Sequence, residues 1–413
     1  MVNEVLRTDI PNDWDVITLG DYAQIFRGGS PRPIQAFLTT SDQGINWIKI
    51  GDVGAGEKFI ESTEEKIIPE GVSRSRMVCK GDLILSNSMS YGRPYIMNIE
   101  GCIHDGWLVI QKYDRLFNRE YLYYALSSDL TMRQYVAMAA GSSVQNLNKE
   151  KVSKVVLPCP KILEQKKIAE VLSSIDALIV ELQKLIRKKK DIRQGTMQML
   201  VTGKKRLDGF DGEWVKINLS KNSKLKARIG WQGLTTAEYL DEGYSYLITG
   251  TDFKDGQIDW NGCHYVDYNR YEQDPNIQVS NDDLLLTKDG TIGKVAYVAD
   301  LTRPATLNSG VFLVKPITDA YTAHFMFYVL ESSVFKDFLQ QLSAGSTINH
   351  LYQKDLVKFD LYVPPTKEEQ EAIAGILFDM DSDIHRLEKK LSKYQKIKQG
   401  MMEELLTGKV RLI

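Results

Sequence analysis

Apolar residues recur in alternating steps of four and three along two stretches of the chain, which is the pattern of a coiled-coil seam. The seam positions of the first stretch are Ile168, Leu172, Ile175, Ile179, Leu182, Ile186, Lys189, Arg193, Thr196 and Leu200. Those of the second stretch are Ile373, Leu377, Met380, Ile384, Leu387, Leu391, Tyr394, Lys398, Met401 and Leu405. Each stretch covers roughly 35 to 40 residues and predicts a helix about 55 Å long.

Neither apolar stripe can be buried by its own helix, so the simplest partner of each helix is the other. We therefore assign helix pairing and subunit contact to the apolar seam residues Ile168, Leu172, Ile175, Ile179, Leu182, Ile373, Leu377, Ile384, Leu387 and Leu391. The last third of the first seam is polar, at Lys189 and Arg193, and this predicts looser packing at that end.

The signs of the charges favour an antiparallel pair. A parallel pair in register would put like charges side by side, as at Lys184 and Lys389. An antiparallel pair would bring opposite charges together: Lys189, Lys190 and Arg193 near Asp379, Asp381 and Asp383, and Lys393, Lys396 and Lys398 near Asp176 and Glu181. Each contact contributes only a few tenths of a kcal/mol, but all the signs agree.

The two stretches belong to one internal repeat. Ile373 follows Ile168, and Gly408 follows Gly203, by the same 205 positions. That period is far too long for a solenoid, so one unit, a globular domain followed by a helix, occurs twice. A duplicated protein suits a partner with two similar halves, and duplex DNA with two half-sites is the leading candidate.

The repeat also predicts where the C-terminus lies. At the same offset Ile413 corresponds to Asp208, and Trp14 corresponds to Trp214 through the acidic-Trp pair that opens each globular domain. About six residues separate the two equivalent points, a reach of at most about 20 Å. If a pseudo-twofold axis relates the repeats, the C-terminus lies near Trp14 and the chain nearly closes into a ring.

The globular segments carry short strands at matching places, such as WLVIQ at 107–111 and VFLVKP at 311–316. Strands outnumber helices in each segment, so the predicted class is α+β. The predicted boundaries are 1–157 and 206–361 for two similar globular domains, and 158–205 and 362–413 for the helical regions. Residues 53–80 and 253–282 share little sequence, as expected if each domain recognises something different.

The sequence carries no pattern of a resident enzyme. It has no N/D-P-P-Y methyltransferase motif and no G-x-x-x-x-G-K-S/T phosphate loop. The five histidines and four cysteines show no metal or redox spacing. We therefore expect no catalytic residue, metal or cofactor on this chain, and reduced thiols in a cytoplasmic protein.

The length of apolar runs bears on membrane binding, and the net charge bears on nucleic-acid binding. No apolar run reaches the roughly 18 residues of a membrane span, so no membrane partner is expected. The net charge of −2 argues mildly against nucleic acid, although it can hide a local basic patch.

Two matched pairs of loops nevertheless carry side chains suited to DNA: FRGGSPR at 26–32 with KARIGWQG at 226–233, and SNSMSYGRP at 86–94 with TKDGTIGK at 287–294. Such side chains contact phosphates and base edges. The DNA-binding candidates are Arg27, Ser30, Arg32, Ser88, Tyr91, Arg93, Trp231, Gln232, Lys288, Thr291 and Lys294. These stretches could be plain surface turns, but their recurrence in both domains favours DNA contact.

The order of these features, repeated twice, resembles the DNA specificity subunits of type I restriction-modification systems over essentially the whole chain. The carriers are P-x-x-x-E-Q-x-x-I opening each helix, T-G-K after each helix, the GDL strand at 81–83 and the link A-G-S-x-x-x-x-L, which begins at 140 and at 344. The resemblance implies two target recognition domains, each reading one half of a split double-stranded DNA site.

The resemblance also implies partners. Two modification subunits would dock on the helices and methylate adenine, and restriction subunits would cleave DNA. S-adenosylmethionine, Mg and ATP are then expected on the partner subunits only. The near-neutral charge departs from a simple DNA binder and suggests that the partners supply much of the phosphate contact.

Two other classes remain open. A specificity region detached from a fused methyltransferase-nuclease would keep a hidden activity, which a methyl-transfer assay on the lone chain would reveal. A coiled-coil scaffold with two protein-binding modules would show no salt-dependent DNA binding when combined with a methyltransferase partner.

Overall fold

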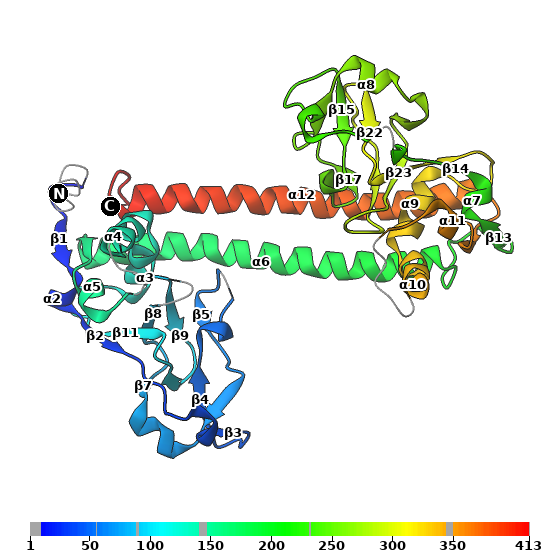
Figure 1. Ribbon diagram of the computed structural model, residues 1–413. Coiled ribbons are helices and arrows are strands. Elements are labelled where there is room, and N and C mark those ends of the chain that lie inside the picture. The colour runs from blue at the N-terminus through cyan, green and yellow to red at the C-terminus, as the bar shows by residue number, and fades with distance from the viewer. Residues whose placement is uncertain are drawn as a thin grey trace. The chain divides into compact units, whose positions relative to one another are not determined.

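The computed structural model describes residues 10–54, 56–87, 91–139, 147–230, 233–343 and 350–412. The chain is α+β, as predicted, and divides into two compact units (Figure 1). Unit 1 comprises Met1–Gln183 and Lys389–Ile413, and unit 2 comprises Lys184–Glu388. Each unit thus joins one globular domain to part of each long helix. The boundaries that separate helical regions from globular domains stay a prediction.

Unit 1 contains two five-stranded sheets, ordered β2-β11-β8-β9-β5 and β3-β6-β4-β10-β7, and a separate pair, β1 with β12. The strands are β1 (Asp15–Thr18), β2 (Gln24–Arg27), β3 (Leu38–Thr39), β4 (Ile45–Ile48), β5 (Phe59–Ile60), β6 (Glu65–Ile67), β7 (Arg76–Val78), β8 (Leu83–Ser86), β9 (Pro94–Met97), β10 (Gly101–Ile103), β11 (Trp107–Gln111) and β12 (Val156–Cys159). The 3-10 turns are η1 (Ile34–Ala36), η2 (Ile50–Asp52) and η3 (Pro69–Arg74).

The first sheet of unit 1 is covered on both faces, which explains why β8 is an unbroken apolar run. Successive side chains of a strand point to opposite faces. Leu83 and Leu85 therefore enter the core that contains the helices, while Ile84 enters the core shared with the second sheet. Every residue of β8 is buried as a result.

The short helices of unit 1 are α2 (Leu19–Tyr22), α3 (Arg119–Ser127), α4 (Asp129–Ala139) and α5 (Lys149–Ser153). Asn118 caps α3, because its side-chain oxygen accepts a hydrogen bond from the Tyr121 backbone N–H at 3.1 Å. Leu122 of α3 lies in one core with Ile168 and Leu172 of the long helix α6 (Ile162–Val201). The helix α3 therefore fastens the sheet to α6.

Unit 2 follows the same plan. Its sheets are ordered β14-β23-β20-β21 and β18-β15-β22-β19, with the pairs β13-β24 and β16-β17. The strands are β13 (Val215–Asn218), β14 (Ser223–Lys226), β15 (Ser245–Ile248), β16 (Phe253–Lys254), β17 (Gln257–Ile258), β18 (His264–Val266), β19 (Gln278–Val279), β20 (Leu284–Thr287), β21 (Val295–Tyr297), β22 (Ala305–Leu307), β23 (Val311–Pro316) and β24 (Asp360–Val363). The helices and 3-10 turns are α7 (Leu219–Asn222), α8 (Tyr268–Glu272), α9 (Ala323–Glu331), α10 (Ser333–Leu342), α11 (Gln353–Leu356), η5 (Thr236–Glu238), η6 (Gly250–Asp252) and η7 (Pro275–Ile277).

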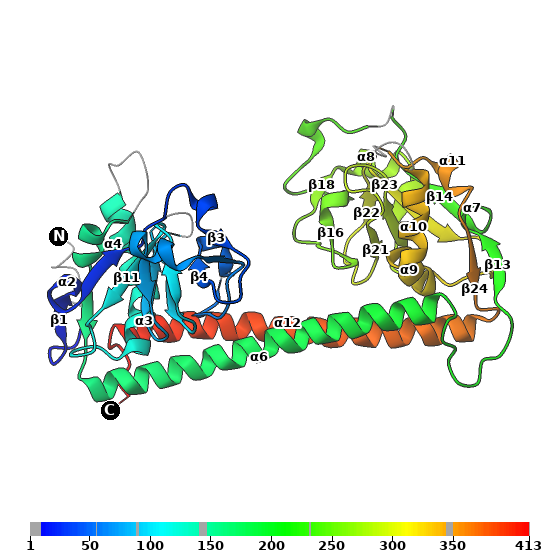
Figure 2. The same ribbon diagram turned by 90° about the horizontal axis from the view of Figure 1, so that it is seen from below.

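Within each unit, the segments of the two long helices, α6 and α12 (Lys367–Leu406), run antiparallel, as the charge pattern predicts (Figures 1 and 2). In unit 1, Lys398 Nζ lies 2.6 Å from Asp176 Oδ1, so the late part of α12 contacts the early part of α6. In unit 2, Lys189 Nζ lies 2.5 Å from Asp383 Oδ2. Each pair joins an early residue of one helix to a late residue of the other, as only an antiparallel pair can.

The apolar seam is buried as predicted over most of its length. Ile168, Leu172, Ile175, Ile179, Leu182, Ile373, Leu377 and Ile384 are all buried, and Leu387 and Leu391 are half-buried. Gly203 and Gly408 follow the helices in the left-handed conformation, with φ of 67° and 72°. Both positions therefore favour glycine, and both end a helix as the sequence indicates.

The expectation of looser packing at the polar end of the first seam is wrong. Arg193 Nε donates to Asp381 Oδ1 at 2.8 Å, and its NH2 group donates to Asp381 Oδ2 at 3.0 Å and to Glu331 Oε2 at 2.5 Å. The neighbouring Leu200 is 3% exposed. Burial by itself would lower the pKa of Arg193, but the two carboxylates raise it above its usual value. The seam is closed there by ion pairs instead of apolar contacts.

No helix in the described part of the chain is both long and apolar enough to cross a membrane.

Candidate nucleic-acid interface

The predicted DNA loops of unit 1 converge at one end of the sheet β2-β11-β8-β9-β5. Arg27, the last residue of β2, pairs with Leu108, and Ser86, the last residue of β8, pairs with Trp107 at the start of β11. Both pairings are antiparallel. The chain after Arg27, the chain after Ser86 and the chain before Trp107 therefore share one edge.

Backbone hydrogen bonds tie these segments together. The Asn87 N–H donates to the Gly106 carbonyl at 2.9 Å, and the Leu147 N–H donates to the Asn87 carbonyl at 3.1 Å. Leu147 ends the Ala-Gly-Ser link, whose residues 140–146 lie outside the described part of the chain. Leu147, the last residue of the link, thus meets Asn87 of the 86–94 loop at this edge.

Arg27 and Ser30 meet at Asp105, in the turn between β10 and β11. Arg27 Nε donates to the Asp105 carbonyl at 3.0 Å, and Ser30 Oγ donates to Asp105 Oδ1 at 2.7 Å. Burial alone would raise the pKa of the Asp105 carboxyl, but Ser30, His104 and Arg27 outweigh it and hold the pKa below its usual value. Asp105 is therefore a carboxylate at neutral pH and organises the edge.

The other DNA-binding candidates of unit 1 differ in exposure and in the contacts that they already make. Arg32 and Arg93 are exposed. The Tyr91 hydroxyl donates to the Tyr135 carbonyl at 3.0 Å, so this group braces the loop and leaves the half-buried ring for other contacts. Ser88 lies outside the described residues. DNA contact by these residues stays a prediction.

The second domain builds an equivalent edge from β14, β20, β21 and β23. Thr287 Oγ1 accepts from the Lys294 N–H at 2.9 Å, just as Ser86 Oγ accepts from the Arg93 N–H at 3.0 Å. This correspondence places Lys294 at the position of Arg93, as the sequence alignment of the two loops predicts.

The remaining candidates of unit 2 lie around this loop. Thr291 and Lys294 are exposed. Lys288 is half-buried, and its Nζ lies 5.4 Å from the centre of the Phe312 ring. Trp231 and Gln232 lie outside the described residues, so their predicted DNA contact stays open.

Sequence reasoning missed Arg228, which stands at the base of the 226–233 loop. Its side chain is 1% exposed, and Nε donates to the Leu307 carbonyl at 2.9 Å. Its NH1 group is buried without a hydrogen-bond partner among the described residues. Burial and the nearby charge of Arg270 lower the pKa of Arg228. No sequence signal distinguishes a buried arginine from its exposed neighbours in such a loop.

The Glu-Gln pair that opens each long helix is visible in the sequence as a repeated motif, but its contacts were not predicted. In unit 1, Glu164 is 1% exposed and accepts from Arg411 Nε at 2.6 Å and NH2 at 2.8 Å. Gln165 Oε1 accepts the N–H of Asn118 at 2.8 Å, and its Nε2 donates to the Leu116 carbonyl at 2.9 Å. The signal was available, because the pair recurs at the 205-residue offset.

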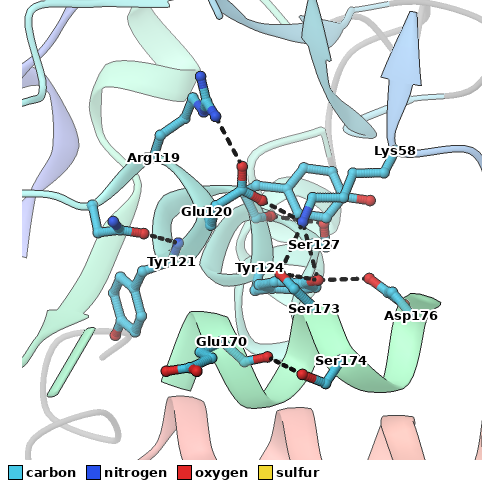
Figure 3. A network of polar contacts seen from close by, with 12 residues as sticks. Lys58, Arg119, Glu120, Tyr121, Tyr124, Ser127, Glu170, Ser173, Ser174 and Asp176 are labelled. Carbon is cyan, nitrogen blue, oxygen red and sulfur yellow. Dashed lines mark hydrogen bonds and ion pairs between the residues drawn. The ribbon is translucent and has the colours of Figure 1, made fainter. Parts of the chain in front are cut away.

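Figure 3 shows a polar network that fastens the globular domain of unit 1 to α6. Lys58 Nζ lies 3.1 Å from the Tyr124 hydroxyl and 3.2 Å from Ser173 Oγ, and it forms an ion pair with Glu120. The Tyr124 hydroxyl donates to Asp176 Oδ2 at 2.6 Å. Burial and this acceptor raise the pKa of Tyr124 well above its usual value.

The network continues to α12, because Asp176 also pairs with Lys398. Unit 2 repeats the arrangement with other residues: the Tyr328 hydroxyl donates to Asp381 at 3.1 Å, and Asp381 pairs with Arg193. The sheet edge that carries the predicted DNA-contact residues thus belongs, in each unit, to a domain that is anchored to both helices of that unit.

No cluster of three or more His, Cys, Asp or Glu side chains within the described ranges could hold a metal ion. The four cysteines are free, and three of them are buried.

Comparison with known proteins matches both repeats. The family model of the type I restriction modification DNA specificity domain matches residues 11–194 and again residues 205–399. The chain is 24% identical over 421 residues to the MjaVIII type I restriction enzyme specificity subunit of Methanocaldococcus jannaschii, covering 98% of this chain and 94% of the relative. It is 22% identical over 424 residues to the EcoBI specificity subunit of Escherichia coli, covering 97% and 87%.

A solved structure shares the fold. The crystal structure of the type I restriction-modification S subunit from M. genitalium aligns with a TM-score of 0.61 at 17% sequence identity, covering 96% of each chain.

Proposed function

Because this chain belongs to the family of type I restriction-modification DNA specificity subunits, we propose that it reads a bipartite DNA site, one half-site with each globular domain. The observation that carries this proposal is the duplicated sheet edge. The same backbone frame, with Ser86 and Arg93 in unit 1 and Thr287 and Lys294 in unit 2, holds different side chains in the two copies. A shared frame with different side chains is what two readers of different sequences require.

The proposal extends to partners. Two modification subunits dock on the long helices, and restriction subunits join through them. The support is a row of exposed apolar side chains on the part of α6 that lies in unit 2, at seven-residue spacing: Leu185, Ile192 and Met199 are 40%, 49% and 42% exposed. An exposed apolar row of this kind marks a protein-binding face.

The chemistry belongs to the partners in this proposal. S-adenosylmethionine, Mg and ATP bind the modification and restriction subunits, and this chain contributes recognition without a catalytic residue. The complex works on cellular DNA in the cytoplasm, where the free cysteines stay reduced.

Methylome sequencing tests the proposal. A host that expresses this chain with its modification subunits should carry methylated adenine in one motif with two short half-sites separated by a non-specific gap. Methylation of one continuous short motif would contradict bipartite reading. Methylation by the lone chain would contradict the non-catalytic role.

A further inference from the structure

Arg27 is held at the recognition edge of unit 1 with part of its guanidinium free. Nε donates to the Asp105 carbonyl at 3.0 Å, and NH2 lies 3.9 Å from Asp105 Oδ2. The side chain is nevertheless 57% exposed. One side of the guanidinium is therefore turned toward Asp105, while NH1 has no hydrogen bond or ion pair to another described residue.

Asp105 is itself fixed from several sides. Ser30 Oγ donates to its Oδ1 at 2.7 Å, and His104 Nε2 lies 3.3 Å from the same oxygen. The Asp105 carbonyl also accepts from Asn87 Nδ2 at 3.0 Å. Asn87 is 4% exposed. These contacts hold Asp105 in place, and its carbonyl in turn holds the exposed side chain of Arg27.

The His104 ring is oriented by its other nitrogen. Nδ1 accepts the Gly106 N–H at 2.8 Å. Nε2 is therefore the ring nitrogen that faces Asp105 and can donate to it.

From this arrangement, and resting on the proposed function, we infer that Arg27 reads a guanine in the half-site of unit 1, with Asp105 as its positioning residue. An arginine fork donates two parallel hydrogen bonds, and guanine O6 and N7 are the base edge that accepts both. A freely rotating surface arginine loses much side-chain entropy on such a contact, whereas a braced one has already lost part of it.

The second domain has no arginine at the position that corresponds to Arg27. In unit 1, Phe26 of β2 pairs with Val109 of β11, and in unit 2, Lys226 of β14 pairs with Leu313 of β23. Lys226 therefore corresponds to Phe26, and the next residue, Ala227, corresponds to Arg27. Alanine cannot donate to a base edge. The guanine contact is accordingly a property of the first half-site alone.

The test uses the full chain assembled with its modification subunits. The methylated motif is mapped for the wild type and for Arg27→Ala, Arg27→Lys and Asp105→Asn, after a swap of residues 1–155 has assigned one half-site to unit 1. Arg27→Ala should lower discrimination at one G·C pair of that half-site by about 10- to 100-fold. Asp105→Asn should weaken discrimination at the same pair by less, because the backbone carbonyl that Arg27 contacts is retained.

Arg27→Lys separates base reading from phosphate contact. Lysine keeps the charge but has no fork, so this variant should lose guanine discrimination while it keeps non-specific affinity and its salt dependence. A wild-type motif for Arg27→Lys would overturn the guanine assignment. A half-site of unit 1 without a G·C pair would overturn it equally.

Controls keep this inference apart from the proposed function. Arg115→Ala removes an exposed arginine beyond the far end of β11 and should leave the motif unchanged. Thermal melting shows whether Asp105→Asn still folds. If Asp105→Asn melts like the wild type and discriminates like it, Asp105 is not a positioning residue. A wild-type complex without any defined motif would instead contradict the proposed function itself.

Discussion

Arg206 and Glu369 form a two-point ion pair that joins the segment after α6 to the first turn of α12: Arg206 Nε lies 2.6 Å from Glu369 Oε1, and NH2 lies 2.8 Å from Oε2. Glu369 is 1% exposed. Arg411 and Glu164 repeat this pairing in unit 1. One such pair closes the helix pair in each unit, because it bonds the segment that follows one helix to the first turn of the other.

Removing one residue of this ion pair should therefore lower the stability of the folded chain. Arg206→Ala leaves the buried Glu369 carboxylate unpaired and should lower the free energy of unfolding by about 3 kcal/mol. Glu369→Gln in the same chain should restore part of this loss, since it removes the uncompensated charge. Denaturant unfolding measures both changes. The exposed neighbour Lys205 provides the control Lys205→Ala, and equal effects of the two alanine variants would contradict the role given to the ion pair.

The chain should tolerate circular permutation. The prediction that the C-terminus lies near Trp14 is confirmed: the Arg411 guanidinium lies 5.4 Å from the centre of the Trp14 ring, and its NH1 donates to Asp13 Oδ1 at 2.9 Å. A permutant that joins Ile413 to the N-terminal segment through a short linker, and opens between Asp208 and Gly209, should fold and methylate the same motif. Both new ends fall at exposed positions. Loss of the wild-type melting transition would argue against the closed arrangement.

Arg93→Ala tests the second candidate on the edge of unit 1. Arg93 is exposed, while its backbone is held by Ser86, so the substitution should spare the fold. DNA affinity of the assembled complex should fall by about 1 to 3 kcal/mol if the contact is to a base. Assembly with the modification subunits should not change. Unaltered affinity together with an unaltered motif would remove Arg93 from the interface.

Leu387→Asp tests the helix pair. Leu387 is half-buried in the seam, so a carboxylate there should lower the free energy of unfolding by about 2 kcal/mol or more. Pairing of the helices and docking of the modification subunits should both weaken, as size-exclusion chromatography would show. Ser392→Asp, at an exposed position of the same helix, is the matched control. Normal assembly of Leu387→Asp would show that this part of α12 is not packed in a seam.

The sequence predicted those features of the fold whose residues recur at a regular spacing. Leu172 and its seam neighbours recur at a fixed spacing, and the charges beside them gave the helix direction. The helix α4 was missed because its buried face is partly polar: Gln134 is 3% exposed and exchanges two hydrogen bonds with the Val156 backbone. A buried glutamine whose side chain hydrogen-bonds to a strand backbone cannot be distinguished in the sequence from a glutamine on the surface.

The recognition edge was predicted only in part. Matching loops in the two repeats pointed to Arg27 and Lys294, because recurrence is visible in one sequence. Asp105 and Arg228 were not found, since each acts through contacts with residues distant in the chain. Convergence of separate loops depends on strand register, and a local pattern does not carry that information.

The central claim is that each domain reads its own half of a split site. Residues 1–155 can be replaced by the corresponding segment of a relative, which exchanges the whole edge built by β2, β8 and β11 and keeps that of unit 2. Methylome sequencing of the exchanged complex should show one half-site changed and the other retained. A change in both halves, or methylation of one continuous motif, would contradict independent reading by the two domains.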